Sequence, residues 1–292
     1  MNENNWREVI AALDQITART GGEFWNERVI ALTRAGNLGG RAAVEEFLEK
    51  DRLAGKGFGT SSQVFEGWAS MDPAAAWEWM RQSGDESLRR ACLVRFAWGM
   101  AAADPSKHFD YFRDLTDGDK LLVAVDATRA LLQTEGFPAA DRLLSTEAAS
   151  DAGENATSLH AIFDVIARQR RHAVQNGANP EEACQWFAAN ADKPFVSSEQ
   201  FRQMAALLAT SKSQSAAAEW MASVYTANSA RATGPALTAA IKTWAAGDPN
   251  AAGEWLRGQS RHPGYQAMVS GFVAAIAKDD PEAAAAWQKT VE

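Results

Sequence analysis

Apolar and polar residues along this chain follow a repeated pattern that predicts short helices with a common start. Asp-Pro, then alanines, then a tryptophan occurs at 72–79, 248–255 and 280–287, and weaker copies begin at 104, 179, 213, 40 and 137. With the proline position as marker, the copies fall at 41, 73, 105, 138, 180, 214, 249 and 281, at spacings of 32, 32, 33, 42, 34, 35 and 32 residues. A period of this size is typical of helical repeats.

Each position in the pattern has a mechanical reason. Asp, Asn or Ser before the marker can accept a hydrogen bond from the first free N–H groups of a helix. Proline at the first helical position gives up no hydrogen bond there. The residue six beyond the marker is large in every copy, and offsets two, three, six and seven trace one helix face. The residues at offset six are Phe47, Trp79, Tyr111, Leu144, Trp186, Trp220, Trp255 and Trp287.

A second, longer helix then leads to the next marker, as over 87–102 and 265–277, and an additional helix pair is expected at 5–20 and 23–35. One such hairpin cannot bury its apolar stripe, but stacked neighbours share a continuous core. We therefore expect an all-α solenoid of about eight helix hairpins. It would form a single array over 1–292.

The spacing of 42 residues marks an insertion of about nine residues between markers 138 and 180. The segment 145–157 is small, polar and acidic, which predicts a loop. It would divide the array into halves at 1–145 and 158–292. A helix is expected from Ser158, continuing towards Gly177, with Leu159, Ile162, Phe163 and Ile166 facing inward.

The pattern Asp-Pro-x-x-Ala-x-x-Trp resembles the opening of tetratricopeptide repeats, whose period of about 34 residues is close to the one found here. The resemblance covers most of the chain. It implies a right-handed α-α superhelix and a groove that binds peptides. The chain departs from that family where Leu-Gly and then Tyr are expected, because Met80-Arg81-Gln82 follows Trp79 and Leu256-Arg257-Gly258 follows Trp255.

Charge and hydropathy narrow the range of partners. The net charge is −8 and no large basic face is evident, which argues against nucleic acid. No apolar run is long enough to insert into a membrane, and the first residues do not form a signal peptide. Two separated cysteines, Cys92 and Cys184, suit a reducing compartment. We expect a soluble cytoplasmic protein, while an export signal removed upstream remains an open alternative.

Acidic residues recur five beyond the marker. In a regular stack they would form a row, and Arg81, Arg113 and Arg257 follow three of them by three positions. Such pairs are ordinary support for an exposed helix face. The functional alternative is an acidic track that recognises a basic segment of a partner. The acidic residues are Glu46, Glu78, Asp110, Glu219 and Glu254.

Two further candidate contacts lie outside the repeat positions. Trp77, and with it Trp25, could belong to an aromatic ligand surface rather than to the core. Arg168, Arg170 and Arg171 form the densest basic cluster of an acidic chain. They are either a solvated helix end or a contact for an anion, an acidic partner or the acidic track of a second copy.

The sequence offers no recognisable catalytic, cofactor or metal motif. Gly55–Ser62 looks like a phosphate loop but lacks the required order of residues and the preceding strand, so a turn ending in a helix cap is expected. The four histidines lack metal-ligand spacing. We expect a non-catalytic scaffold that binds a protein or peptide. An α/α-toroid enzyme with an unrecognised carboxylate site and a self-assembling homo-oligomeric module remain open alternatives.

Overall fold

A computed structural model describes residues 1–22, 24–55, 57–103, 111, 115–150 and 156–291. In this part of the chain every helix or strand assigned is an α-helix, which confirms the all-α prediction. The chain divides into two compact units, Met1–Ile162 and Phe163–Glu292. The division falls inside helix α9 (Ala156–Gln175), not in the segment 145–157.

The predicted loop at 145–157 is wrong at its beginning. Helix α8 (Phe137–Ser150) continues through 145–150, where Glu and Ala favour helix. The hydroxyl of Ser145 donates to the carbonyl oxygen of Asp141 at 2.8 Å, so this polar side chain is satisfied within the helix. Residues 151–155 lie outside the described part.

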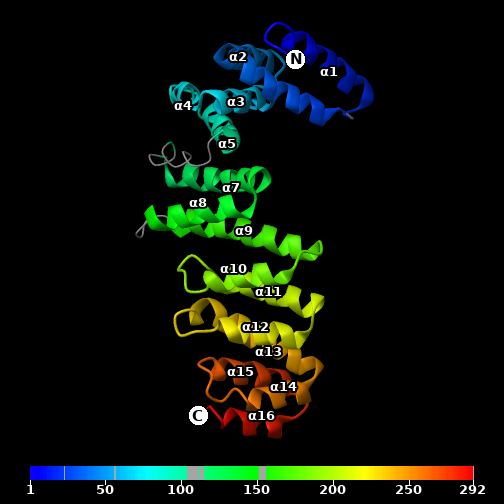
Figure 1. The fold of residues 1–292 in the computed structure, drawn as a ribbon, viewed down its shortest axis with the longest axis vertical. Helices are drawn as coiled ribbons and strands as arrows, with labels where there is room; N and C mark the ends of the chain where they lie inside the picture. Colours follow the sequence, from blue (N-terminus) through cyan, green and yellow to red (C-terminus); the bar gives the residue numbers. More distant parts are fainter. Residues whose placement is uncertain (23, 56, 104–110, 112–114, 151–155, 292) are drawn as a thin grey trace. The chain divides into compact units, whose positions relative to one another are not determined.

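The helices of the first unit follow one another from the N-terminus, as Figure 1 shows in blue to green. The second in order, α2, changes direction at Gly40, whose φ of 54° and ψ of −137° are not helical. This break coincides with the degenerate marker at 41. The helices are α1 (Trp6–Thr20), α2 (Trp25–Leu53), α3 (Gly59–Met71), α4 (Pro73–Arg81), α5 (Glu86–Ala103), α7 (Asp117–Thr134) and α8, followed by the start of α9.

The second unit alternates longer and shorter helices after the end of α9. Helix α9 extends to Gln175 and buries Leu159, Ile162, Phe163 and Ile166, as predicted. The remaining helices are α10 (Pro180–Ala189), α11 (Ser198–Ser211), α12 (Gln214–Val224), α13 (Ala230–Gly247), α14 (Pro249–Arg257), α15 (Tyr265–Ile276) and α16 (Pro281–Gln288).

The predicted helix caps are present at five markers. The side chains of Asp72, Asp248 and Asp280 accept from the backbone N–H three residues later, at 3.1, 2.9 and 2.9 Å. Ser213 accepts from the N–H three residues later at 3.0 Å, and Asn179 accepts from the N–H of Glu181, two residues later, at 3.0 Å. These bonds satisfy N–H groups that the helix itself leaves free, and each cap therefore fixes where a short helix begins.

The five tryptophans at offset six are less buried than predicted, although Phe47 and Leu144 at the same offset are buried, and the residues after four of the tryptophans lie in the core. Trp79, Trp186, Trp220, Trp255 and Trp287 are half-buried. Their neighbours Met80, Phe187, Met221 and Leu256 are at most 1% exposed. Each tryptophan packs on a ring of the long helix just before it, for example Trp186 on Phe163 with ring centroids 4.6 Å apart. The rings thus join each short helix to the long helix that precedes it along the chain.

Glycines let neighbouring long helices approach each other closely. A Cβ atom on Gly36 would overlap the carbonyl oxygen of Val64, and one on Gly67 would overlap that of Thr33. Gly99 lies in the same way against Glu66, and Gly271 lies against Thr238 in the second unit. Backbone packing of this kind joins α2 to α3, α3 to α5, and α13 to α15.

Candidate partner-binding surfaces

The acidic row begins with Glu46, which the structure uses internally. Its carboxylate accepts from Arg7 Nε of α1 and from Lys50 Nζ of α2, both at 2.8 Å. Burial alone would raise the pKa of Glu46, but the hydrogen bonds and charges of Lys50 and Arg7 outweigh it and lower the pKa. Glu46 therefore ties α1 to α2 and is a poor candidate for a partner contact.

Three other members of the row, Glu78, Glu219 and Glu254, are exposed on α4, α12 and α14. Within the described residues the expected ion pairs to Arg81 and Arg257 are not formed. Glu78 accepts instead from Gln82 Nε2 at 2.8 Å, and the Arg257 guanidinium lies 6.0 Å from the centre of the Trp287 ring. Asp110 and Arg113 lie outside the described residues. These three carboxylates remain available to a basic partner.

Trp77 was predicted to face a ligand, and this prediction is wrong. The residue is 9% exposed, and its ring centroid lies 5.0 Å from that of Phe96 and 5.5 Å from that of Tyr111. Its place at offset four lies beside the apolar stripe of α4, but side chains beyond α4 cover it. Trp25 differs, because it is 56% exposed and its ring faces the Arg28 guanidinium at 5.5 Å.

The basic cluster of α9 does not form one exposed patch. Arg168 pairs with Asp164 at 2.9 Å, and the Arg170 guanidinium lies 4.9 Å from the centre of the Trp186 ring. Arg171 is 8% exposed, and loss of hydration lowers the pKa of its guanidinium. Arg170 lies two positions from Arg168 and points in a different direction, whereas Arg171, three positions from Arg168, lies on the same face but is buried. Arg168 and Arg170 make separate contacts and Arg171 is covered, so a shared exposed anion site is not supported.

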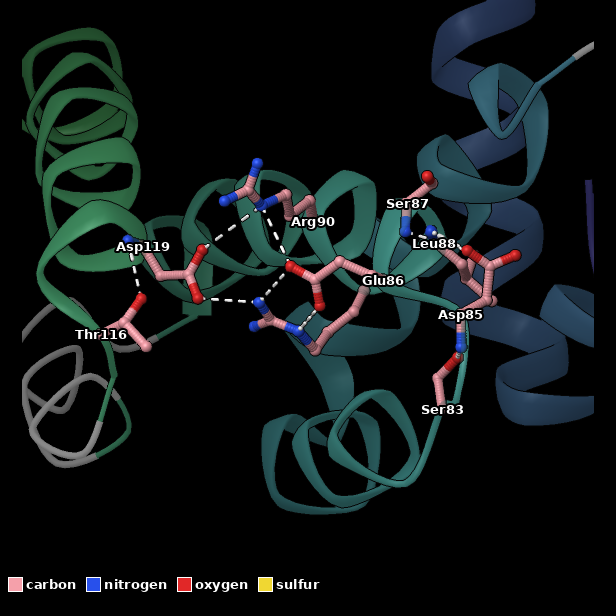
Figure 2. A network of polar contacts seen from close by, with 9 residues as sticks. Ser83, Asp85, Glu86, Ser87, Leu88, Arg90, Thr116 and Asp119 are labelled. Atoms are coloured by element: carbon pink, nitrogen blue, oxygen red, sulfur yellow. Dashed lines mark hydrogen bonds and ion pairs between the residues drawn. The ribbon is translucent and has the colours of Figure 1, made fainter.

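A charged network at the start of α5 and α7 was not found from the sequence. Figure 2 shows Asp119 at the start of α7 beside Arg90 and Glu86 of α5. Asp119 Oδ2 accepts from Arg89 Nη2 at 2.8 Å, Arg90 Nε lies 3.8 Å from Oδ1, and both arginines also pair with Glu86. The Asp119 side chain is 3% exposed. Two cations here balance two carboxylates, so the network joins helices rather than attracting a charged ligand. The sequence signal is Thr116-x-x-Asp119, a helix start with an acid in its first turn.

The described part of the glycine-rich segment at 55–62 leads into helix α3 at Gly59, but the predicted Thr or Ser cap is not present, and the cap comes from Asp51 instead. Asp51 Oδ2 accepts from the backbone N–H groups of Thr60 at 3.1 Å and of Ser61 at 2.7 Å. These groups open α3, the place where a phosphate would bind in a phosphate loop. The chain's own carboxylate occupies that place.

A groove in the second unit is the clearest docking surface among the described helices. It encloses about 420 Å³ between α11 and α13, with the start of α12 at its edge. Alanine methyl groups form most of its surface, and Thr210, Gln214 and Thr243 add polar groups. Arg202 at its border is held by Glu199 of the same helix. The alanines are Ala205, Ala206, Ala209, Ala217, Ala236, Ala239 and Ala240.

The two cysteine thiols are not activated as nucleophiles in the folded chain. Both cysteines are unpaired. Burial raises the pKa of the Cys92 thiol to about 12, and burial together with the charge of Glu181 raises that of Cys184 to about 11. Within the described residues no three His, Cys, Asp or Glu side chains are placed to share a metal ion. The same residues include no helix that could span a membrane.

No protein-family model, curated protein or solved structure matches this chain.

Proposed function

We propose that the chain is a non-catalytic scaffold of about eight helix pairs, stacked as a right-handed superhelix, that binds a protein or peptide partner. Within each unit, successive long helices contact one another in sequence order: α2 with α3, α3 with α5 and α5 with α7, and then α11 with α13 and α13 with α15. Packing of each pair on its neighbours is how repeats share a core.

The two unpaired thiols favour a cytoplasmic setting.

The observation that carries this proposal is the alanine-lined groove between α11 and α13. A volume of about 420 Å³ is enough for a few apolar side chains. Small side chains leave the helix backbones accessible, so an apolar segment could approach closely and remain well packed. Arg202 is the one charged residue among the described residues that line the groove, and its charge is paired with that of Glu199. The expected occupant is a neutral apolar segment of another protein.

Filling the groove tests this function. The wild-type chain and an Ala206→Trp variant would be used to capture proteins from the native source, because residue 206 lines the groove and is exposed. Ala246→Trp is the matched control, since Ala246 is an exposed alanine of α13 outside the groove. We expect one partner to be retained by the wild type and by Ala246→Trp and to be lost from Ala206→Trp.

Two outcomes would contradict the proposal. Retention of the same partner by Ala206→Trp would exclude the groove as the contact. Self-association of the purified chain that Ala206→Trp abolishes would show that the groove holds a second copy, which is the self-assembling alternative. Circular dichroism of both variants would establish that each is folded.

A further inference from the structure

A second pocket lies in the first unit, between the end of α2, the turn that follows it and the start of α5. It encloses about 440 Å³ and is referred to here as the α2–α5 pocket. Leu48, Phe58 and Leu88 give it an apolar surface, while Gly55 and Gly57 contribute no side chain. Asp51, Arg52 and Asp85 complete the lining.

Two carboxylates of the pocket each use one oxygen within the chain and leave the other free. Asp51 is 4% exposed, and both of its hydrogen bonds, to the N–H groups of Thr60 and Ser61, end on Oδ2. Asp85 Oδ1 accepts from the N–H groups of Ser87 at 2.9 Å and Leu88 at 3.0 Å, a cap at the start of α5 that Figure 2 shows. Within the described residues, Asp51 Oδ1 and Asp85 Oδ2 have no hydrogen-bond partner.

Among the lining residues that the structure describes, no free cation balances the charge of these carboxylates. Arg52 is the pocket's one cation among the described lining residues, and two hydrogen bonds of 2.8 and 2.6 Å hold the Arg52 guanidinium on Glu49. A carboxylate as buried as Asp51 has lost much of its hydration, and a cation brought by a ligand would offset that loss.

We propose that the α2–α5 pocket binds a lysine side chain of the partner. The four-carbon stem would lie on Leu48, Phe58 and Leu88, and the ammonium would lie between Asp51 Oδ1 and Asp85 Oδ2. Lysine fits better than arginine, because a guanidinium pairs best with both oxygens of one carboxylate, whereas an ammonium can bridge single oxygens of two. This inference rests on the proposed function and specifies one contact of it.

The test uses n-butylammonium as a probe for the lysine side chain, with 1-butanol as its neutral counterpart. Binding to the full chain would be followed by NMR shifts of the Gly55 and Gly57 amides. Measurements would be repeated in a Lys56→Gln background, because this lysine stands between Gly55 and Gly57 in the sequence and its charge is thereby removed from the test. We expect saturable shifts with n-butylammonium and none with 1-butanol.

Neutral variants make the test specific. Asp51→Asn and Asp85→Asn keep a side-chain oxygen for the helix cap and remove the charge, and Asn is as good a cap as Asp. Each should weaken n-butylammonium binding by about tenfold, as expected for one charged hydrogen bond. Asp72→Asn is the control. Asp72 caps α4 in the same way but does not line the pocket, so this variant should bind n-butylammonium as the wild type does.

Equal effects of n-butylammonium and 1-butanol, or equal affinities of Asp51→Asn, Asp85→Asn and Asp72→Asn, would overturn the pocket assignment. The result is separable from the proposed function. If the probe binds but no partner is captured, the pocket assignment stands and the scaffold function is contradicted. If a partner is captured through the groove but the probe does not bind, the scaffold function stands and the pocket assignment is contradicted.

Discussion

At the scale of the residue, the offset-six tryptophans and their offset-seven neighbours have different surroundings. Trp255 is half-buried and packs on Trp244 with ring centroids 5.5 Å apart, while Leu256 is completely buried. The periodicity of α14 placed both side chains on the inward face. It could not say which one lies deeper, because that depends on how the long helix α13 approaches.

This difference predicts unequal losses of stability. Leu256→Ala should lower the free energy of unfolding by about 3 kcal/mol, within the range for fully buried leucines. Trp255→Ala should cost about half of the roughly 3–5 kcal/mol typical of a fully buried tryptophan, because part of the side chain still contacts water in the folded chain. Urea denaturation measures both, and a larger loss for Trp255→Ala would show that the ring is a core residue.

Glu66 provides a pH-dependent test at the same scale. Burial raises the pKa of its carboxyl, and the nearby Arg95, whose Nη1 lies 3.0 Å from Glu66 Oε2, does not cancel that effect. The folded chain therefore holds the Glu66 proton at a pH where the unfolded chain, with a pKa of about 4.3, has released it. By linkage, this group favours the folded state less as the pH rises through that window.

Glu66→Gln removes this titration. The free energy of unfolding of the wild type minus that of the variant should fall as the pH rises from about 4 to about 7, in the direction that linkage requires. Denaturation of both proteins at matched pH values measures the difference. A difference that grows with pH would mean that the Arg95 ion pair dominates and that the pKa is lowered.

At the scale of the element, local signals were readable from the sequence and non-local ones were not. The caps Asp72, Asn179 and Asp280 depend only on residues within one turn, and they were predicted correctly. Burial of Trp77 depends on Phe96, a residue of the next long helix, and was missed. Helix geometry separates Arg170 from Arg168, so that part was open to prediction, whereas the burial of Arg171 depends on neighbouring helices and was not.

The glycines of the long helices are a further signal that sequence analysis overlooked. Gly36, Gly67 and Gly99 recur at intervals of 31 and 32 residues, close to the repeat period. Each one is a point where a neighbouring backbone leaves no room for a Cβ atom. The period alone could have identified them as packing positions, but only the structure shows that they face carbonyl oxygens.

Gly67→Ala tests the close approach of α2 and α3. The new methyl group would overlap the Thr33 carbonyl, so the helices must move apart, and we expect a loss of about 3 kcal/mol, at the upper end for overpacking. Gly84→Ala is the control, because a Cβ atom there would meet nothing within 4 Å. It should change stability by less than about 0.5 kcal/mol. Similar melting temperatures for the two variants would contradict the packing of α2 on α3.

At the scale of the whole molecule, the proposal joins two features of different units. The alanine groove between α11 and α13 would receive an apolar segment, and the α2–α5 pocket would receive a lysine side chain. The exposed carboxylates Glu78, Glu219 and Glu254 could add contacts to basic residues of the partner, without requiring a specific geometry. A scaffold gains affinity by engaging several such sites on one partner.

The claim on which the function depends is that helix pairs stack in sequence order, and small-angle X-ray scattering tests it most directly. Eight pairs that each advance by about 10 Å should give a particle about 80 Å long. Its radius of gyration should exceed the roughly 19 Å of a compact domain of this size. A radius close to that compact value, with a scattering profile of a ring around a central funnel, would contradict the stacked array and favour the toroid alternative.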